Sequence, residues 1–208
     1  GGPVYLVNPK HRRIAGRDCF SGIDALPETP DLAVIATPPN TIPSLIAGLG
    51  KKGTPAAVVV TAGFDRDLKQ AMLEAARPTC LRIIGPNCLG LWVPALGVNA
   101  NFGMARPTPG KLAFLSQSGA LVGGVLDWAT SHGIGFSYVV SMGEMADVDV
   151  GDLLDFLAAD ISTGAILLYL ETIPSARKFM SASRSAARAK PVVVIKSGRS
   201  EASAKAAA

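Results

Sequence analysis

The chain has 208 residues, of which 49% are hydrophobic and 17% are charged, and its mean hydropathy is +0.33. This composition supplies enough apolar side chains for a folded core and excludes an intrinsically disordered chain. The apolar fraction is high for a monomer. We therefore expect part of the apolar surface to be covered, either by a partner in an oligomer or by a further segment of the protein. The apolar runs are interrupted well before the length of a membrane span, which predicts no transmembrane helix.

The charged residues give a formal net charge of +4 and a pI near 9.1. The basic residues are dispersed and form no stripe interleaved with aromatic residues, so nucleic-acid binding is not indicated. Local anion sites for a phosphorylated small molecule fit this charge equally well. The cysteines Cys19, Cys80 and Cys88 form no Cys-x-x-Cys motif and the chain has two histidines, so we expect no metal site. Free thiols without a leader peptide predict a reducing compartment, the cytoplasm.

The first half of the chain alternates short apolar strands with helices. We expect strands at 4–7, 32–36, 56–60 and 81–84, and helices at about 42–49 and 68–76. Each strand ends in Pro, Gly or Asn turn residues. Continuous apolar strands that alternate with helices are typical of a parallel sheet covered on both faces, in which these turns would share one edge.

The second half repeats this alternation after a Pro-, Gly- and Asn-rich stretch, 91–109, that we interpret as a linker. We expect strands at 111–115, 136–141, 165–170 and 192–196, helices at 119–131, 152–159 and 177–189, and a helix-permissive tail at 200–208. The fold class is therefore α/β, with two tandem units at 1–107 and 108–208. The first unit lacks the strand, Gly-rich turn and helix with which a nucleotide-binding sheet usually begins.

A turn at 85–90 follows the strand expected at 81–84 and places Cys88 just beyond the strand end. In an open parallel sheet this is where ligands bind. A structural turn with an inert, buried cysteine is the alternative. A nucleophilic Cys88 would need a positioned base, and neither His11 nor His132 is identifiable as one. We therefore interpret Cys88 as a residue that lines a pocket.

A second turn, Ser116-Gln117-Ser118-Gly119, leads from a strand into an apolar helix. Free backbone N–H groups at the helix start, beside serine hydroxyls, form an anion site. The alternative is that Ser118 is only a helix N-cap. A hydrolase nucleophile elbow, Gly-x-Ser-x-Gly, fits neither serine.

Two acidic features remain. Glu171 stands at the carboxyl end of the strand expected at 165–170, where it either is solvated or orients an imidazole. The stretch 144–155 contains four aspartates but does not match a calcium loop. We expect it to cap the following helix.

Eight motifs occur along the chain in order. They are Asn8-Pro9-Lys10, Asp31-Leu32-Ala33-Val34-Ile35, Thr61-Ala62-Gly63-Phe64, Gly85-Pro86-Asn87-Cys88-Leu89-Gly90, Ser116-Gln117-Ser118-Gly119-Ala120, Gly143-Glu144-Met145-Ala146-Asp147-Val148-Asp149, Leu168-Tyr169-Leu170-Glu171 and Lys196-Ser197-Gly198-Arg199. Together they resemble the NDP-forming acyl-CoA synthetases, relatives of the succinyl-CoA synthetase α subunit. The resemblance spans essentially the whole chain.

The resemblance implies a Rossmann-like CoA-binding domain followed by a flavodoxin-like domain of the succinyl-CoA synthetase type. In this family an acyl-CoA and phosphate give CoA and an acyl phosphate, whose phosphoryl group passes to a histidine and then to ADP or GDP. The implied CoA-binding residues are Lys10, Thr37, Pro38, Pro39, Thr61, Ala62, Gly63, Asn87 and Cys88. The implied phosphate-binding residues are Ser116, Gln117, Ser118 and Gly119. Glu171 would orient the phosphohistidine.

The sequence also departs from the family pattern. The family's phosphohistidine lies a few residues after the motif at 196–199, in a Ser-His-Thr-Gly context, and is not reached here; His132 does not match its position. The Gly-rich turn for the CoA phosphates does not precede 4–7, and no ATP-grasp domain for ADP, ATP and Mg²⁺ follows. We therefore expect a partial chain, inactive alone, that acts with an ATP-grasp domain or a β subunit.

Two other functions stay open. The first is a non-catalytic, CoA- or acyl-CoA-sensing regulatory module, because similar domain pairs are fused to protein acetyltransferases. The second is a nicotinamide-dependent dehydrogenase, which rests only on the α/β alternation and lacks a Gly-x-Gly-x-x-Gly motif.

Overall fold

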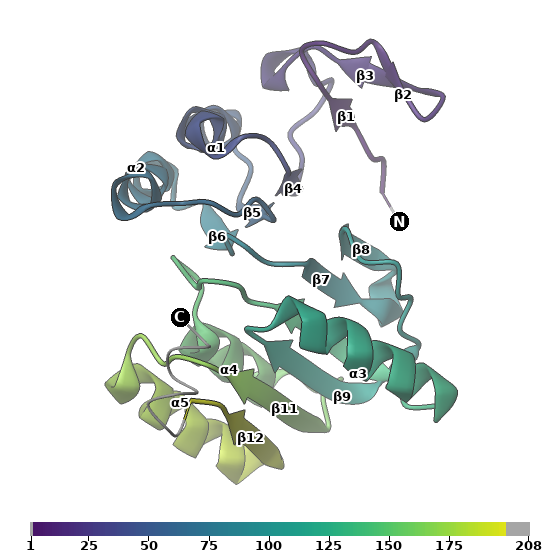
Figure 1. Ribbon diagram of the computed structural model, residues 1–208, viewed down its shortest axis with the longest axis vertical. Helices are drawn as coiled ribbons and strands as arrows, with labels where there is room; N and C mark the ends of the chain where they lie inside the picture. Colours follow the sequence, from purple (N-terminus) through teal and green to yellow (C-terminus); the bar gives the residue numbers. More distant parts are fainter. Residues whose placement is uncertain (1, 199–208) are drawn as a thin grey trace.

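The computed structural model describes residues 2–198, which form two α/β units arranged one above the other along the long axis (Figure 1). The sheet of the first unit contains β4 (Leu32–Ile35), β5 (Ala56–Val59) and β6 (Arg82–Ile84), all parallel, in the order β4-β5-β6. Helices α1 (Ile42–Lys52) and α2 (Arg66–Ala76) pack on it. The strands and helices predicted for 32–84 are confirmed to within a few residues. The carboxyl ends of the three strands share one edge, as expected.

A separate three-stranded sheet precedes this unit, in the order β1-β3-β2. Its strands are β1 (Leu6–Val7), β2 (Arg13–Ile14) and β3 (Arg17–Phe20). The strand predicted at 4–7 is therefore shorter than expected and does not belong to the β4–β6 sheet. The β2–β3 hairpin was missed because its flanking residues do not alternate between apolar and polar, and its turn uses Ala15 and Gly16 at positive φ.

The second unit is built on a six-stranded sheet in the order β12-β11-β9-β10-β7-β8. β9 (Pro109–Ser116), β10 (Phe136–Ser141), β11 (Ala165–Leu170) and β12 (Val192–Lys196) run parallel. β7 (Gly90–Val93) and β8 (Val98–Asn101) form an antiparallel hairpin on the β10 edge. The four parallel strands confirm the predicted flavodoxin-like sheet.

The β7–β8 hairpin occupies part of the segment predicted to be a linker, so that prediction was wrong. Two of the residues that suggested a linker, Pro94 and Gly97, form the connection between the two strands, where Gly97 has a φ of 65°. Trp92 pairs with Val139 of β10 and is 2% exposed. Burial of this indole against the sheet outweighs the loop-like composition around it.

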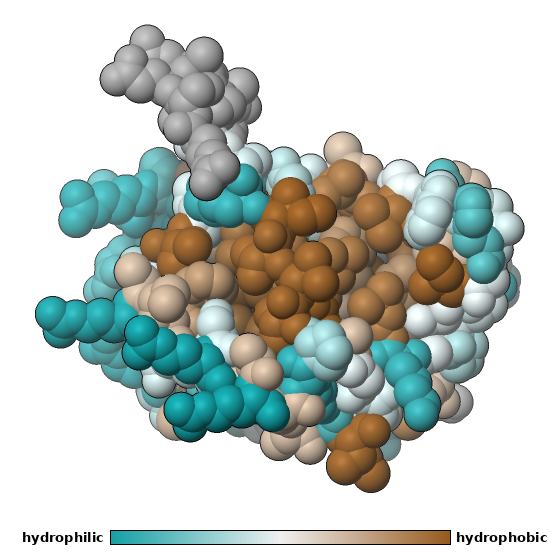
Figure 2. Space-filling model, turned by 90° about the horizontal axis from the view of Figure 1, so that it is seen from below, coloured by the Kyte–Doolittle hydropathy of each residue, from teal (hydrophilic) through white to brown (hydrophobic). Residues whose placement is uncertain are grey.

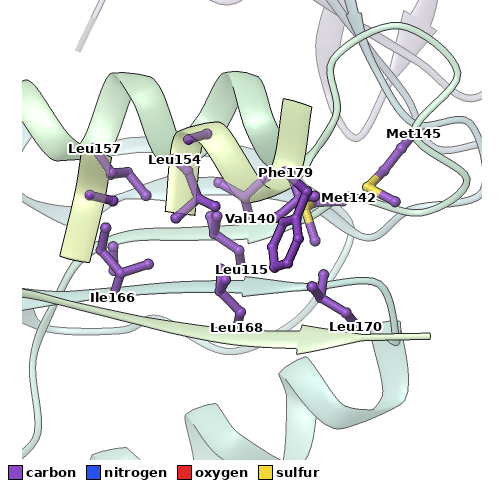
Figure 3. Packing of buried hydrophobic residues seen from close by; sticks show 14 residues of the cluster. Leu115, Val140, Met142, Met145, Leu154, Leu157, Ile166, Leu168, Leu170 and Phe179 are labelled. Atoms are coloured by element: carbon purple, nitrogen blue, oxygen red, sulfur yellow. The ribbon is translucent and has the colours of Figure 1, made fainter. Parts of the chain in front are cut away.

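Helices cover both faces of the six-stranded sheet (Figure 1). α3 (Gly119–Ser131) packs on one face, where Phe114 points, while α4 (Val150–Ala159) and α5 (Ala176–Ala189) pack on the other. Figure 3 shows side chains of α4 and α5, among them Leu154 and Phe179, packed against Leu115 on the sheet. The alternation of β9 residues between the two clusters follows from the two-residue period of a strand.

β12 is an edge strand with exposed apolar side chains. Val193, Val194 and Ile195 are 57%, 42% and 51% exposed. Seen from below, the molecule presents a broad apolar patch at this end (Figure 2). The expectation that a partner or further segment covers apolar surface stays a prediction. The tail at 200–208 lies outside the described residues, and within 2–198 no helix is both long and apolar enough to cross a bilayer.

The loop 142–149, between β10 and α4 of the second unit, packs against the end of β6 in the first unit. Its backbone N–H groups at Glu144, Ala146 and Val148 donate to the carbonyl oxygens of Pro86, Gly85 and Ile83, at 3.0, 3.0 and 3.1 Å. The Asp147 carboxylate accepts from the N–H of Ile83 at 2.7 Å and from Arg82 Nε at 3.0 Å. The loop therefore satisfies the outer edge of β6 as an additional strand would.

The acidic residues that follow this loop cap α4, as predicted. Asp149 is the N-cap and accepts from the N–H groups of Gly151 and Asp152 at 2.8 and 3.1 Å. Asp152 completes a capping box by accepting from the N–H of Asp149. Lys178 of α5 donates to both carboxylates at 2.9 and 2.7 Å. Within 2–198 no group of three or more His, Cys, Asp or Glu side chains is arranged to hold a metal ion.

We expect Asp152→Asn to reduce the dependence of stability on pH below about 4. Partial burial is the largest influence and favours the neutral acid, but the hydrogen bond from Lys178, the N–H of Asp149 and the charges of Lys178 and Arg82 together lower the pKa of Asp152 below 3.8. Because the pKa of Asp152 is lower in the folded protein than in the unfolded chain, its ionised carboxylate stabilises the fold. This stabilisation is fully present above the unfolded pKa and is lost as the pH falls through the folded pKa.

The measurement is the urea concentration at the midpoint of unfolding, at pH 7 and at pH 3. Relative to the parent chain, Asp152→Asn should have a lower midpoint at pH 7 and a smaller drop at pH 3. Asp155→Asn, an exposed aspartate on the same helix, is the control. Equal pH dependence in both variants would contradict the assignment.

Candidate functional site

Three turns meet at the carboxyl edge of the β4-β5-β6 sheet. The Thr61 hydroxyl donates to the carbonyl oxygen of Thr37 at 2.8 Å, and the N–H of Asn87 donates to the carbonyl oxygen of Thr61 at 2.9 Å. A Cβ atom at Gly63, whose φ is 87°, would lie 3.8 Å from Pro39 Cγ. The turns predicted to bind CoA from 37–39, 61–63 and 85–88 are therefore adjacent in the structure.

The surface of these turns is formed by exposed, uncharged groups at Pro38, Ala62, Gly63 and Asn87. Small side chains leave the backbone accessible, which suits close contact with an extended ligand. Lys10 follows β1 in the separate three-stranded sheet, is exposed, and makes no hydrogen bond or salt bridge to these turns within the described residues. The expectation that Lys10 binds CoA stays a prediction.

Cys88 lies in the interior at the end of this edge. It is 4% exposed, and its thiol donates to the carbonyl oxygen of Val59 at 3.4 Å. Burial raises the pKa of Cys88 to about 12, against the smaller opposing influence of a hydrogen bond with the backbone of Gly90. A thiol held in its protonated form is a poor nucleophile, which supports the interpretation that Cys88 does not attack a substrate.

Alkylation should therefore discriminate between the cysteines. We expect Cys80, which is exposed, to react quickly with N-ethylmaleimide at pH 8, while Cys88 stays unmodified until the protein is unfolded in urea. Peptide mass spectrometry over a time course measures both rates in one sample. Labelling of Cys88 as fast as Cys80 in the folded protein would contradict the buried, protonated thiol.

The start of α3 is the second part of the site. Ser118 is the N-cap, as one of the two interpretations of this turn predicted, and its hydroxyl accepts from the N–H of Leu121 at 3.4 Å. The Ser116 hydroxyl is fully buried and bonds to the carbonyl oxygen and the N–H of Ser118 at 2.9 and 3.1 Å. The N–H groups of Gly119 and Ala120 have no partner within the described residues, so this helix end can accept an anion.

Gln117 and Glu171 meet beside this helix start. The N–H groups of Glu171 and Thr172 donate to Gln117 Oε1 at 2.6 and 2.9 Å. Gln117 Nε2 donates to the Thr172 hydroxyl at 3.0 Å. Within the described residues the Glu171 carboxylate makes no hydrogen bond or salt bridge, so it is available to a group outside them.

Leu89 connects the two parts of the site. It directly follows Cys88, and its N–H donates to the Ser141 hydroxyl at 3.0 Å. A Cβ atom at Gly119 would lie 3.1 Å from Leu89 Cγ, so the helix start packs closely on this side chain. The turn at 85–90 therefore abuts the anion-accepting end of α3 across the junction between the units.

Lys196 and Thr172 also belong to this neighbourhood, and the sequence did not single out their roles. Lys196 Nζ donates to the carbonyl oxygen of Glu171 at 2.8 Å and to that of Ser197. The Ser197 hydroxyl is buried and unpaired within the described residues. The sequence signal was their place at strand ends, where turn residues of parallel strands gather. Thr172 follows β11, which pairs with β9, and Lys196 ends β12, which pairs with β11.

Comparison with known proteins identifies both units. Residues 1–94 match a CoA binding domain, and residues 109–208 match a succinyl-CoA ligase like flavodoxin domain. The chain therefore combines a CoA binding domain with a flavodoxin-like domain of the succinyl-CoA ligase type, in this order. The chain belongs to the NDP-forming acyl-CoA synthetases, and the chains similar to it include several ADP-forming acetate–CoA ligases.

Three relatives illustrate the similarity. The ADP-forming acetate–CoA ligase I of Archaeoglobus fulgidus is 43% identical over 99% of this chain and 31% of that protein. The α subunit of the ADP-forming acetate–CoA ligase I of Pyrococcus furiosus is 38% identical over 100% of this chain and 47% of that subunit. The apo structure of the dinucleotide-forming acetyl-coenzyme A synthetase 1 of Candidatus Korarchaeum cryptofilum superposes with a TM-score of 0.91 at 37% identity, covering 98% of this chain and 46% of that one. The chain thus spans less than half the length of these relatives.

Proposed function

We propose that this chain is the CoA-binding and acyl-phosphate portion of an ADP-forming acyl-CoA synthetase. Phosphate attacks the acyl carbonyl of acyl-CoA, so that the thioester bond breaks and CoA and an acyl phosphate form. The phosphoryl group then passes to a histidine outside the described residues and from it to ADP. The net reaction, acyl-CoA with phosphate and ADP giving acid, CoA and ATP, is reversible.

The observation that carries the proposal is the contact between the two parts of the site. Leu89, next to Cys88 at the edge assigned to CoA, packs on Gly119 at the start of α3. A thioester bound along the three turns with its thiol end near Cys88 would meet a phosphate held by the N–H groups of Gly119 and Ala120. Short reach between the reacting atoms is what a bimolecular step between bound substrates requires.

Within this proposal, Glu171 orients the phosphohistidine by accepting a hydrogen bond from its ring. ADP, ATP and Mg²⁺ are assigned to an ATP-grasp domain or β subunit, because the chain spans less than half the length of its ADP-forming relatives. The chain on its own therefore does not complete a catalytic cycle. The cysteines of the chain are free thiols, which supports a protein that acts in the reducing cytoplasm. We expect the full protein to form an oligomer.

The test uses the full-length protein that carries this chain. ATP formation from acetyl-CoA, phosphate and ADP, measured by luciferase, should be accompanied by an acid-labile phosphoryl label on histidine. Acetyl-CoA is tried first because several of the similar chains are named for acetate. Absence of both CoA binding by calorimetry and phosphohistidine labelling, over a panel of acyl-CoAs, would exclude the function. CoA binding without labelling would instead favour the regulatory module, which the ligase relatives do not favour.

A further inference from the structure

We infer that Gln117 is a positioning residue for Glu171 and does not itself bind phosphate. The inference rests on the proposed function and assigns a different role to a residue that the sequence grouped with the phosphate ligands. It follows from where the two ends of the Gln117 side-chain amide are already bonded.

Both polar atoms of the amide have partners on the β11 turn. Oε1 accepts from the N–H groups of Glu171 and Thr172 at 2.6 and 2.9 Å, which uses both of its lone pairs. Nε2 donates to the Thr172 hydroxyl at 3.0 Å. Of the two N–H groups on Nε2, one is therefore used by this threonine, and three hydrogen bonds together hold the amide against the β11 turn.

The backbone of Gln117 is fixed as well. Its N–H donates to the carbonyl oxygen of Tyr169, which lies on β11 two residues before Glu171, at 3.1 Å. The β9 turn and the β11 turn are therefore connected by four hydrogen bonds through this one residue. Lys196 holds the same peptide from the other side by donating to the carbonyl oxygen of Glu171 at 2.8 Å. The backbone of Glu171 is held at its N–H and at its carbonyl oxygen, while its carboxylate makes no hydrogen bond or salt bridge within residues 2–198.

Fixing the peptide sets the direction in which the carboxylate leaves the sheet edge. Loss of an outer partner that orients a functional group typically costs about 10- to 100-fold in activity. We expect Gln117→Ala in the full-length protein to lower kcat for ATP formation by about this factor, with the KM for phosphate changed by less than about threefold. A large rise in the KM for phosphate with kcat unchanged would assign Gln117 to phosphate binding and overturn the inference.

Two further variants separate positioning from general damage. Thr172→Val removes only the acceptor of Nε2 on an exposed residue, and should lower kcat in the same direction by a smaller factor. In a Glu171→Gln background, Gln117→Ala should add little, because the group that it positions is already disabled. Full additivity of the two substitutions would overturn the inference. Gln70→Ala, a glutamine bonded to Glu74 on the surface of α2, is the matched control and should leave the kinetics unchanged.

Amide hydrogen exchange tests the inference without any turnover. Gln117→Ala should accelerate exchange of the Glu171 and Thr172 N–H groups at least about tenfold, while Gln117→Glu, which keeps the acceptor oxygens, should retain their protection. Unchanged exchange in Gln117→Ala would overturn the inference. If the parent protein itself forms no ATP, the proposed function fails while this result still decides whether Gln117 fixes Glu171.

Discussion

Gly143→Ala is expected to cause a large loss of stability at the junction of the two units. Gly143 has a φ of 59°, and a Cβ atom there would lie 2.2 Å from the carbonyl oxygen of Pro86 and 2.5 Å from that of Asn87. The left-handed backbone costs about 1–2 kcal/mol for a residue with a Cβ atom. Displacing the contacting backbone costs a further amount on the order of 1–3 kcal/mol.

Because both contacting atoms belong to the backbone, rotation of a side chain cannot relieve the overlap. For a protein of this size we expect the melting temperature to fall by roughly 10 °C. Differential scanning fluorimetry measures this, and CoA binding should weaken in parallel because the turn at 85–88 is displaced.

Gly133→Ala is the matched control. Gly133 also has a positive φ, 66°, but a Cβ atom there would meet nothing within 4 Å. The loss of stability in Gly133→Ala therefore reports only the cost of the left-handed backbone. The difference in melting temperature between the two variants gives the cost of the contact with Pro86 and Asn87. Equal melting temperatures for the two variants would show that the loop at 142–149 yields freely.

Glu171→Gln is expected to have the largest effect on activity. The substitution conserves the size of the side chain and the backbone bonds to Gln117 and Lys196, but it removes the negative charge that would stabilise a positioned imidazole. Loss of such a group in proton or phosphoryl transfer typically costs about 10²- to 10⁴-fold. In the full-length protein, both ATP formation and the histidine label should fall by this factor.

Stability and CoA affinity should be unchanged in Glu171→Gln, since the carboxylate makes no hydrogen bond or salt bridge within residues 2–198. Glu74→Gln, an exposed substitution of the same kind on α2, serves as the control. A variant that labels as fast as the parent would remove Glu171 from the phosphoryl-transfer step.

The regular part of the fold could be predicted from the sequence because its strands are largely apolar and end in turn residues. β10, β11 and β12 were predicted with their bounds, as was α3, since Ser118 and the helix that follows give a clear start. The β7–β8 hairpin could not be predicted in the same way. Its Pro and Gly residues are typical of a linker, and only burial of Trp92 against β10 makes them a turn.

The candidate site was predictable at the level of strand ends and less so at the level of single side chains. The turns after β4, β5 and β6 were expected to meet because parallel strands share an edge, and they do. The connection of Gln117 to Glu171 spans 54 residues, and no local pattern encodes it. Lys10 lies after β1, which pairs with β3 in a separate sheet, so strand-end reasoning about the β4-β5-β6 sheet does not extend to it.

The loop that covers the edge of β6 also has a consequence for synthesis. Asp147 follows Ile83 by 64 residues, so β6 leaves the ribosome well before the backbone groups that will satisfy its outer edge. At about 5–20 residues per second, this interval lasts on the order of 3–13 seconds. During that time the nascent first unit exposes an open strand edge, which is a substrate for chaperones and a site for pairing between neighbouring chains.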